Sequence, residues 1–171
     1  MIAFLYSLPS RRIWWLGLAA LCVTLEGIAL YYQYALGYLP CVLCIHVRML
    51  LFALLLLALV GVFSGHSRRI GVILMLPTTM LWIWMLERSY QLLGTERGWI
   101  MGECQMASGL PDWLALEQWM PWLFRIHEPC GYTPFVLFRV SMAEILIVLS
   151  AFMVLLCLAS LVASLRQRSP A

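Results

Sequence analysis

A Cys-x-x-Cys pair is the feature of this chain best suited to chemistry. It lies in the segment Pro40-Cys41-Val42-Leu43-Cys44-Ile45-His46-Val47-Arg48, where an uncharged connection ends and a long apolar run begins. Two thiols at this spacing can close a small disulfide ring, and Arg48 follows the second thiol by about one helical turn. Because the pair lies where water gives way to lipid, it suggests electron transfer between a protein and a molecule dissolved in the membrane.

The expected surroundings of Cys44 favour its reactive form. A thiolate is the nucleophile in disulfide exchange, and both a helix N-terminus and a neighbouring cation stabilise it. If a helix begins near Cys41, Cys44 lies in its first turn, and Arg48 at i+4 shares the face of Cys44. A guanidinium near the bilayer edge is costly without a partner, so Arg48 is predicted to hold a thiolate or a quinone. Snorkelling to the headgroups is the alternative, and His46, on another face, is predicted to be a bystander.

The composition is that of an integral membrane protein. The 171 residues are 64% hydrophobic and 11% charged, whereas soluble domains carry about 25% charged residues. All 11 basic side chains are arginine, the net charge is only +3, and no nucleic-acid partner is expected. Neither a dinucleotide-binding fingerprint nor a Ser/His/Asp arrangement is present. Residues 1–171 are predicted to form a single membrane domain.

Four apolar segments are long enough to cross a hydrocarbon core of about 30 Å. The predicted helices cover about residues 13–31, 42–63, 70–90 and 142–165. The predicted fold class is therefore all-α: a four-transmembrane-helix bundle with outer loops at about 32–41 and 94–140. A cleaved signal peptide is a poorer explanation of the first segment, because the run is long and three more follow.

The arginines outside these segments indicate the orientation. Three clusters share one side of a four-span chain: Arg11 and Arg12, Arg68 and Arg69, and Arg166 and Arg168. The positive-inside rule makes that side cytoplasmic, together with both termini. The four cysteines outside the spans then face the oxidising side: Cys41, Cys44, Cys104 and Cys130. Cys22 and Cys157 lie within spans and are predicted to be packing residues.

The long loop carries an apolar stretch of its own between Cys104 and Cys130. Residues 110–124 are too short to span the bilayer and too apolar to lie free in water. Asp112 can cap a helix start, so the stretch is predicted to be a short helix in the headgroup layer. A helix packed against the top of the bundle explains it equally well.

Other polar residues near the outer side are weaker candidates for a site. Glu87, Arg88 and Gln91 at the end of the third span are candidate pocket residues beside Arg48, although a salt-bridged helix end explains them as well. A zinc site is not predicted, because only one Cys-x-x-Cys is present and Cys104 and Cys130 are far apart in sequence. Static structural disulfides are the stronger competitor, since an oxidising compartment forms them readily.

These residues together resemble the disulfide bond formation protein B (DsbB) family of bacterial inner-membrane proteins. The resemblance covers nearly the whole chain: four spans in the same order, Glu26 and Gln33, the cysteine pair with Arg48, and Cys104 and Cys130 around Leu-Pro-Asp-Trp-Leu. It implies a protein-thiol:quinone oxidoreductase that reoxidises a DsbA-like periplasmic thiol oxidase. The implied cofactor is ubiquinone or menaquinone from the membrane pool.

The resemblance also implies a route for the electrons. The reduced partner would attack the Cys104–Cys130 disulfide and form a mixed disulfide at Cys104. Cys130 would then reduce Cys41, freeing Cys44 as a thiolate next to a quinone that Arg48 orients. Family members often carry a histidine or another polar group at the outer end of the third helix, where this chain has Glu87, Arg88, Tyr90 and Gln91.

Three other functions remain open from the sequence. The protein could be a non-catalytic membrane scaffold in which the same cysteines form permanent disulfide bonds that hold an outer loop, and this loop binds a partner. A specialised paralogue could serve one dedicated oxidant. A protein similar to vitamin K epoxide reductase is less favoured, because that family carries its Cys-x-x-Cys late in the bundle, whereas here it opens the second span.

Overall fold

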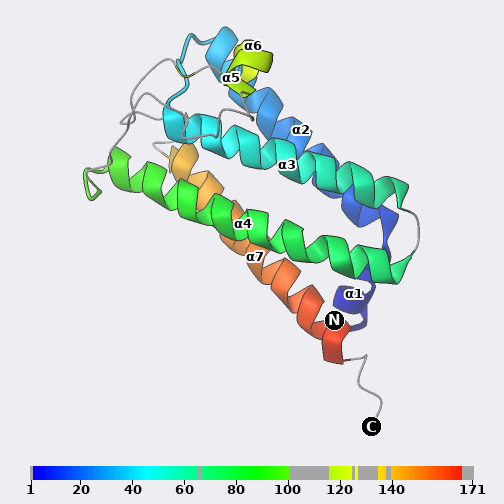
Figure 1. The fold of residues 1–171 in the computed structure, drawn as a ribbon. Helices are drawn as coiled ribbons and strands as arrows, with labels where there is room; N and C mark the ends of the chain where they lie inside the picture. Colours follow the sequence, from blue (N-terminus) through cyan, green and yellow to red (C-terminus); the bar gives the residue numbers. More distant parts are fainter. Residues whose placement is uncertain are drawn as a thin grey trace.

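Four long helices form the body of the molecule. The computed structural model describes residues 2–64, 67–100, 116–124, 126, 135–137 and 140–166. The long helices are α2 (Arg12–Tyr34), α3 (Val42–Phe63), α4 (Arg68–Glu96) and α7 (Met142–Arg166) (Figure 1). All four contain a segment long and apolar enough to cross a membrane. The predicted four-helix membrane bundle is therefore confirmed.

Two of these helices extend past the expected ends. α2 continues to Tyr34 and α4 to Glu96, because no proline lies between the expected and the observed end of either helix. Gly98, with a φ of 70°, then stops α4. The N–H groups of Gly98 and Trp99 donate to the carbonyls of Thr95 and Gly94, which is the Schellman arrangement that a left-handed glycine makes possible.

The helices share one apolar core and turn their other faces outward. Buried side chains from all four meet in it, among them Trp15, Leu54, Trp82 and Met153. Large apolar side chains on the opposite faces are exposed, with Phe63 at 81% and Val148 at 70%. In water such a surface would be unstable, whereas in a bilayer it is the surface that contacts lipid.

The two ends of the bundle differ in what they carry. The start of α1 (Ile2–Ser7) and the end of α7 lie at one end, called the terminal end here, where α1 packs on α7 and η1 (Leu8–Ser10) on α4 (Figure 1). The indole N–H of Trp15 donates to the Pro9 carbonyl at 3.0 Å and so ties η1 to α2. The other end, called the cysteine end here, carries the α2–α3 connection and the start of α7.

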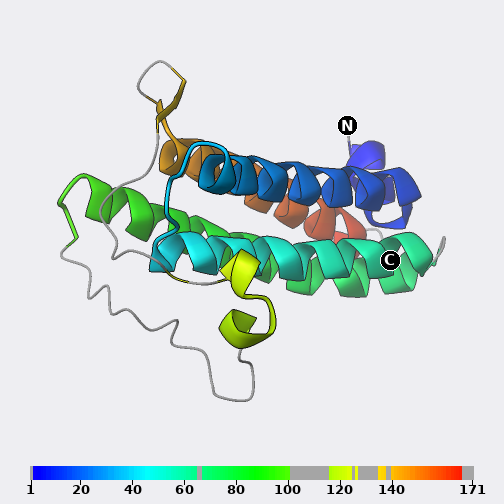
Figure 2. The same cartoon turned by 90° about the horizontal axis from the view of Figure 1, so that it is seen from above.

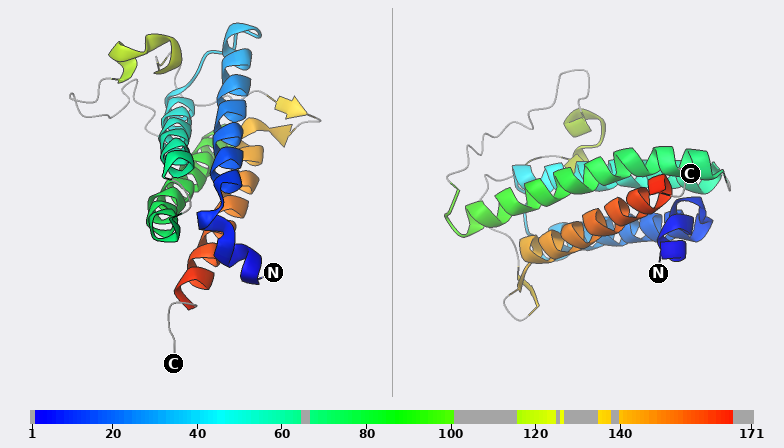
Figure 3. Two further views of the ribbon diagram at one scale, coloured as in Figure 1. Left: turned by 90° about the vertical axis from the view of Figure 1, so that its right-hand side faces the viewer. Right: turned by 90° about the horizontal axis from the view of Figure 1, so that it is seen from below.

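Short elements flank the cysteine end on two sides. α5 (Leu116–Trp119) and α6 (Pro121–Phe124) lie beside α3, whereas the antiparallel hairpin of β1 (Phe135–Leu137) and β2 (Val140–Ser141) lies on the opposite side of the bundle (Figures 2 and 3). The described part of the apolar stretch, residues 116–124, thus contains two single-turn helices. Pro121 explains the break, because it lacks an N–H and disfavours helical geometry at Met120. Asp112 lies outside the described residues.

Candidate functional site

The Cys-x-x-Cys pair forms the first turn of α3. Cys41 is the N-cap residue with extended backbone, and its sulfur accepts the N–H of Cys44 at 3.3 Å. The two sulfur atoms lie 2.7 Å apart. Since a disulfide bond is about 2.05 Å long, only a small movement separates the two thiols from a bridge. The helix start therefore holds the two sulfur atoms close to the separation of a disulfide bond.

The two thiols differ in their surroundings. Cys41 is only 2% exposed and packs with Leu43, Leu92 of α4 and Ala143 of α7, whereas Cys44 at the edge of this cluster is partly exposed. The hydrogen bond to Cys44, and secondly burial, place the pKa of the Cys41 thiol well above its usual range. The hydrogen bond and burial thus favour the protonated form of Cys41, so a negative charge on the reduced pair is more stable on Cys44 than on Cys41.

Arg48 lies one turn further along α3 and is almost completely buried, at 4% exposure. Its guanidinium donates to the Gln33 side-chain oxygen at 2.6 Å and to the backbone carbonyls of Leu123 and Ala29, each at 3.1 Å. These bonds use three of its five N–H donors. Helices α2, α3 and α6 thus meet at one guanidinium, which does not snorkel away from the bundle.

α6 reaches this position because it docks on the ends of α2 and α3. The Tyr34 hydroxyl donates to the Trp122 carbonyl at 2.6 Å. The rings of Phe52 and Phe124 meet edge to face with their centroids 6.1 Å apart, and Leu123 and Phe124 pack on Ile45. The Leu123 carbonyl is therefore a fixed part of the Arg48 site, which no sequence pattern indicated. Gln33 was noted only through the family resemblance.

The candidate pocket residues of α4 form a network of their own. Arg88 donates to the Gln91 side chain at 3.0 Å, and Gln91 donates to Glu87 at 3.2 Å. The Arg88 guanidinium also lies 5.9 Å from the centre of the Trp84 ring. In the described part of the chain, the side-chain hydrogen bonds of these residues join them to one another and not to Arg48. Arg88 lies one turn before Leu92, which packs on Cys41.

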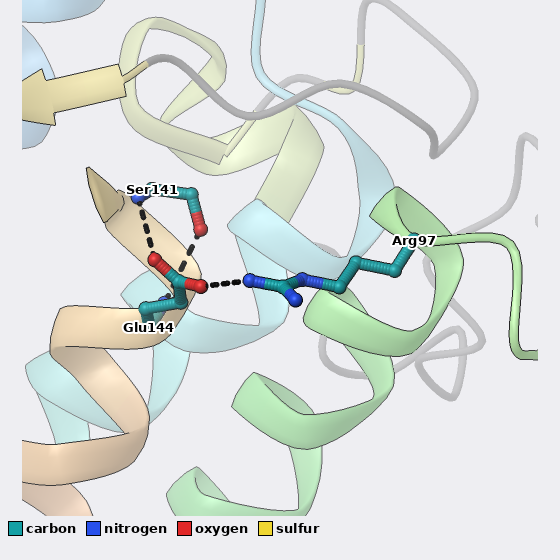
Figure 4. A network of polar contacts seen from close by, with 3 residues as sticks. All are labelled: Arg97, Ser141 and Glu144. Atoms are coloured by element: carbon teal, nitrogen blue, oxygen red, sulfur yellow. Dashed lines mark hydrogen bonds and ion pairs between the residues drawn. The ribbon is translucent and has the colours of Figure 1, made fainter. Parts of the chain in front are cut away.

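A polar network joins α4 and α7, the two helices that pack against Cys41. At the start of α7, Glu144 accepts the N–H of Ser141 at 3.1 Å, and the Ser141 hydroxyl accepts the N–H of Glu144 at 3.4 Å. This reciprocal pair is a capping box. Arg97, the C-cap residue of α4, forms an ion pair with the same carboxylate (Figure 4). The network links the end of α4 to the start of α7 next to Leu92 and Ala143.

The remaining cysteines fall into two groups. Cys22 and Cys157 are fully buried in the core shared by the four helices, in line with the packing role expected for them. Cys104 and Cys130 lie outside the described residues, so their pairing stays a prediction.

Comparison with known proteins places the chain in a family. The fold and site define a membrane protein of four helices with a pair of thiols at the first turn of its second span. The sequence profile of the family described as disulfide bond formation protein DsbB matches residues 11–160. The chain belongs to this family.

Several relatives resemble the chain over nearly its whole length. A protein named disulfide bond formation protein B 2 from Pseudomonas aeruginosa is 30% identical over 154 residues, covering 89% of this chain and 91% of the relative. Disulfide bond formation protein B from Mannheimia succiniciproducens is 28% identical over 173 residues, covering 99% and 96%. The protein of that name from Haemophilus influenzae strain 86-028NP is 27% identical over 175 residues, covering 98% of each chain.

Proposed function

We propose that the chain is a protein-thiol:quinone oxidoreductase that makes disulfides for a DsbA-like periplasmic thiol oxidase. The observation that carries the proposal is the placement of a paired Cys41 and Cys44 at a helix start, one turn from the buried guanidinium of Arg48. Membership of the disulfide bond formation family supports it. The proposed location is the bacterial inner membrane, with both termini cytoplasmic and the redox cysteines periplasmic.

The residues at the cysteine end fit a membrane quinone, either ubiquinone or menaquinone. A quinone when bound supplies a two-electron acceptor of high potential that is soluble in the bilayer. Arg48 retains two N–H donors beyond its three described acceptors, and these can hold a carbonyl oxygen. Cys44 is the partly exposed sulfur of the pair. Glu87, Arg88 and Gln91 are further candidates for the rim of the site.

The cysteines would pass electrons by successive disulfide exchange. The reduced partner would attack the bond between Cys104 and Cys130, and Cys130 would then attack Cys41. Attack at Cys41 makes Cys44 the leaving group, and a thiolate at Cys44 is stabilised by the first turn of α3 and by Arg48. The surroundings of Cys41 support placing the charge on Cys44, because the hydrogen bond to Cys44 and burial raise the pKa of the Cys41 thiol.

Anaerobic quinone reduction by the purified protein tests the proposal. The donor is a reduced thioredoxin-fold dithiol, and the acceptors are ubiquinone and menaquinone. Cys44→Ser should stop quinone reduction, and Cys104→Ser should block acceptance from the donor. The matched control replaces the buried Cys22 and Cys157 with alanine and should keep the full rate. The non-catalytic scaffold with permanent disulfides would be favoured by either of two results. One is full activity in both Cys44→Ser and Cys104→Ser, and the other is no turnover of the unaltered protein with either quinone.

A further inference from the structure

Glu26 lies on the face of α2 that points into the bundle. Trp15, Leu18 and Cys22 are the buried residues of this helix, and their spacing of three and four continues to Glu26, Ala29 and Gln33. Residues with this spacing share one helix face. Ala29 and Gln33 are the two residues of that face that accept hydrogen bonds from Arg48. Glu26 therefore lies in the turn that precedes the Arg48 site.

The carboxylate of Glu26 is buried without a hydrogen-bond partner. Both of its oxygens are shielded from solvent and, in the described part of the chain, neither accepts a hydrogen bond. Among the described residues, Glu26 is the group whose negative charge would stabilise the Arg48 guanidinium most. A buried ionised carboxylate is costly without a nearby cation, and the Arg48 guanidinium offsets part of this cost for an ionised Glu26.

Two groups compete for this one guanidinium. These two groups are the Glu26 carboxylate and the Cys44 thiolate. Cys41 at the start of α3 and Tyr34 at the end of α2 are the other titratable groups that act on Arg48, and Cys22 is the titratable neighbour of Glu26 on α2. α6 contributes the Leu123 carbonyl and not a charge. While Cys44 is in a disulfide, an ionised Glu26 faces no competing thiolate for the Arg48 guanidinium. When Cys44 becomes a thiolate, two anions would face one buried cation, which low dielectric makes unfavourable.

We propose that Glu26 takes up one proton when the Cys41–Cys44 disulfide is reduced and releases it when the pair is reoxidised. A dithiol donor brings two electrons and two protons. The Cys41–Cys44 bond breaks as the donor's own disulfide forms. One proton stays on the Cys41 sulfur, the other goes to the Glu26 carboxylate, and Cys44 carries the negative charge beside Arg48.

Reoxidation reverses this balance. The Cys41–Cys44 bond reforms, two electrons leave for a quinone, and Cys41 and Glu26 each give up one proton, so that the acceptor leaves as a hydroquinone. Glu26 returns to its ionised form beside Arg48, and the net charge of the site is unchanged. The inference rests on the proposed function for its acceptor, but the proton uptake belongs to the cysteine pair and can be measured without a quinone.

Infrared difference spectroscopy of the quinone-free protein tests the proton directly. The sample is the full-length chain with Cys104→Ser and Cys130→Ser, so that only the Cys41–Cys44 pair responds to a soluble dithiol reductant. Reduction should remove a carboxylate band and produce a protonated carboxyl band, and both should be absent from Glu26→Gln. Glu96→Gln, which alters the carboxylate at the end of α4, is the matched control and should leave the bands unchanged.

The pH dependence of the reduction potential of the pair gives a second measurement. Near neutral pH, reduction of the unaltered pair should take up two protons with two electrons. In Glu26→Gln the reduction should take up only one proton, so the slope of the reduction potential against pH should fall to half. A merely structural role for Glu26 would shift the potential but leave the slope. Glu26→Asp keeps a titratable group and should retain the full slope, which covers the case in which Glu26→Gln does not fold.

The outcomes separate this inference from the proposed function. Unchanged infrared bands and slopes in Glu26→Gln would overturn the role of Glu26, even if the protein reduces quinones at Cys44. Bands and slopes that depend on Glu26, in a protein that reduces neither ubiquinone nor menaquinone, would confirm proton uptake by Glu26 and overturn the proposed function.

Discussion

At the scale of single residues, the Arg48 site depends on acceptors that come from three separate elements. Lysine could not replace this arginine, because one ammonium cannot present a planar fork to Gln33, Ala29 and Leu123 at once. The buried guanidinium is also sensitive to loss of any acceptor, since an unpaired buried charge keeps its full desolvation cost.

We expect Gln33→Leu to damage the site without touching a cysteine. Removing the acceptor at 2.6 Å leaves a guanidinium N–H unpaired, which costs about 1–3 kcal/mol and should lower quinone reduction about tenfold. Steady-state quinone reduction and the free energy of unfolding in mixed micelles measure the two effects. Thr24→Val is the control, because Thr24 is exposed on the same helix and, among the described residues, its hydroxyl bonds to the Ala20 carbonyl alone. Equal activity in both variants would contradict the structural role assigned to Gln33.

At the scale of elements, the position of Cys41 depends on how α4 and α7 meet. Leu92 and Ala143 form two sides of its surroundings, and the capping box and the Arg97 ion pair lie immediately beside them. The cap stabilises the first turn of α7, while the ion pair holds this turn to the end of α4.

Two substitutions of Glu144 should separate these contributions. Glu144→Gln keeps an acceptor for the Ser141 N–H and loses only the partly exposed ion pair, so unfolding should become easier by less than about 1 kcal/mol. Glu144→Ala also loses the cap and should cost about 1 kcal/mol more. Unfolding by increasing SDS in mixed micelles measures both. If the two variants lost the same stability, the cap would contribute nothing.

The contact between η1 and α4 depends on a glycine. A Cβ atom at Gly71 would lie 2.1 Å from the Pro9 carbonyl oxygen, whereas a Cβ atom at Gly17 would have nothing within 4 Å. Gly71→Ala should therefore push the two elements apart and cost about 1–3 kcal/mol. Gly17→Ala, the matched control on α2, should be neutral or stabilise by up to about 1 kcal/mol. The same SDS titration compares them, and a stable Gly71→Ala protein would show that η1 moves freely.

At the scale of the whole molecule, the two ends of the bundle should face different compartments. The end of α3, the start of α4 and the end of α7 lie at one end of the bundle, and the cysteine pair at the start of α3 lies at the other. The arginine distribution predicts that the terminal end is cytoplasmic. The exposed residues Leu36 and Ser67 lie in connections at opposite ends.

Labelling of single introduced cysteines tests this orientation. In a chain whose own cysteines are replaced by alanine, Leu36→Cys should react with a membrane-impermeant maleimide added to intact spheroplasts. Ser67→Cys should react only after the membrane is permeabilised, because the headgroup and hydrocarbon layers exclude the charged reagent. The reverse pattern would invert the topology and remove the cysteine pair from the periplasm.

The sequence by itself determined the class of fold and the main chemical groups. Long apolar runs must become helices in a bilayer, since every backbone polar group needs an internal partner there, so four spans followed from composition alone. The placement of Cys41 and Cys44 at a helix start followed from where the apolar run begins, and Arg48 followed from helical periodicity.

Only the tertiary structure decided which groups surround those residues. The Leu123 carbonyl reaches Arg48 from 75 positions away, and a backbone acceptor leaves no mark in side-chain chemistry. The ion pair of Glu144 with Arg97, and the position of Glu26 one turn from the residues of α2 that bind Arg48, likewise depend on how separate helices pack. Local sequence determines where each helix begins and which face is apolar, whereas the contacts between helices depend on the fit of all their side chains at once.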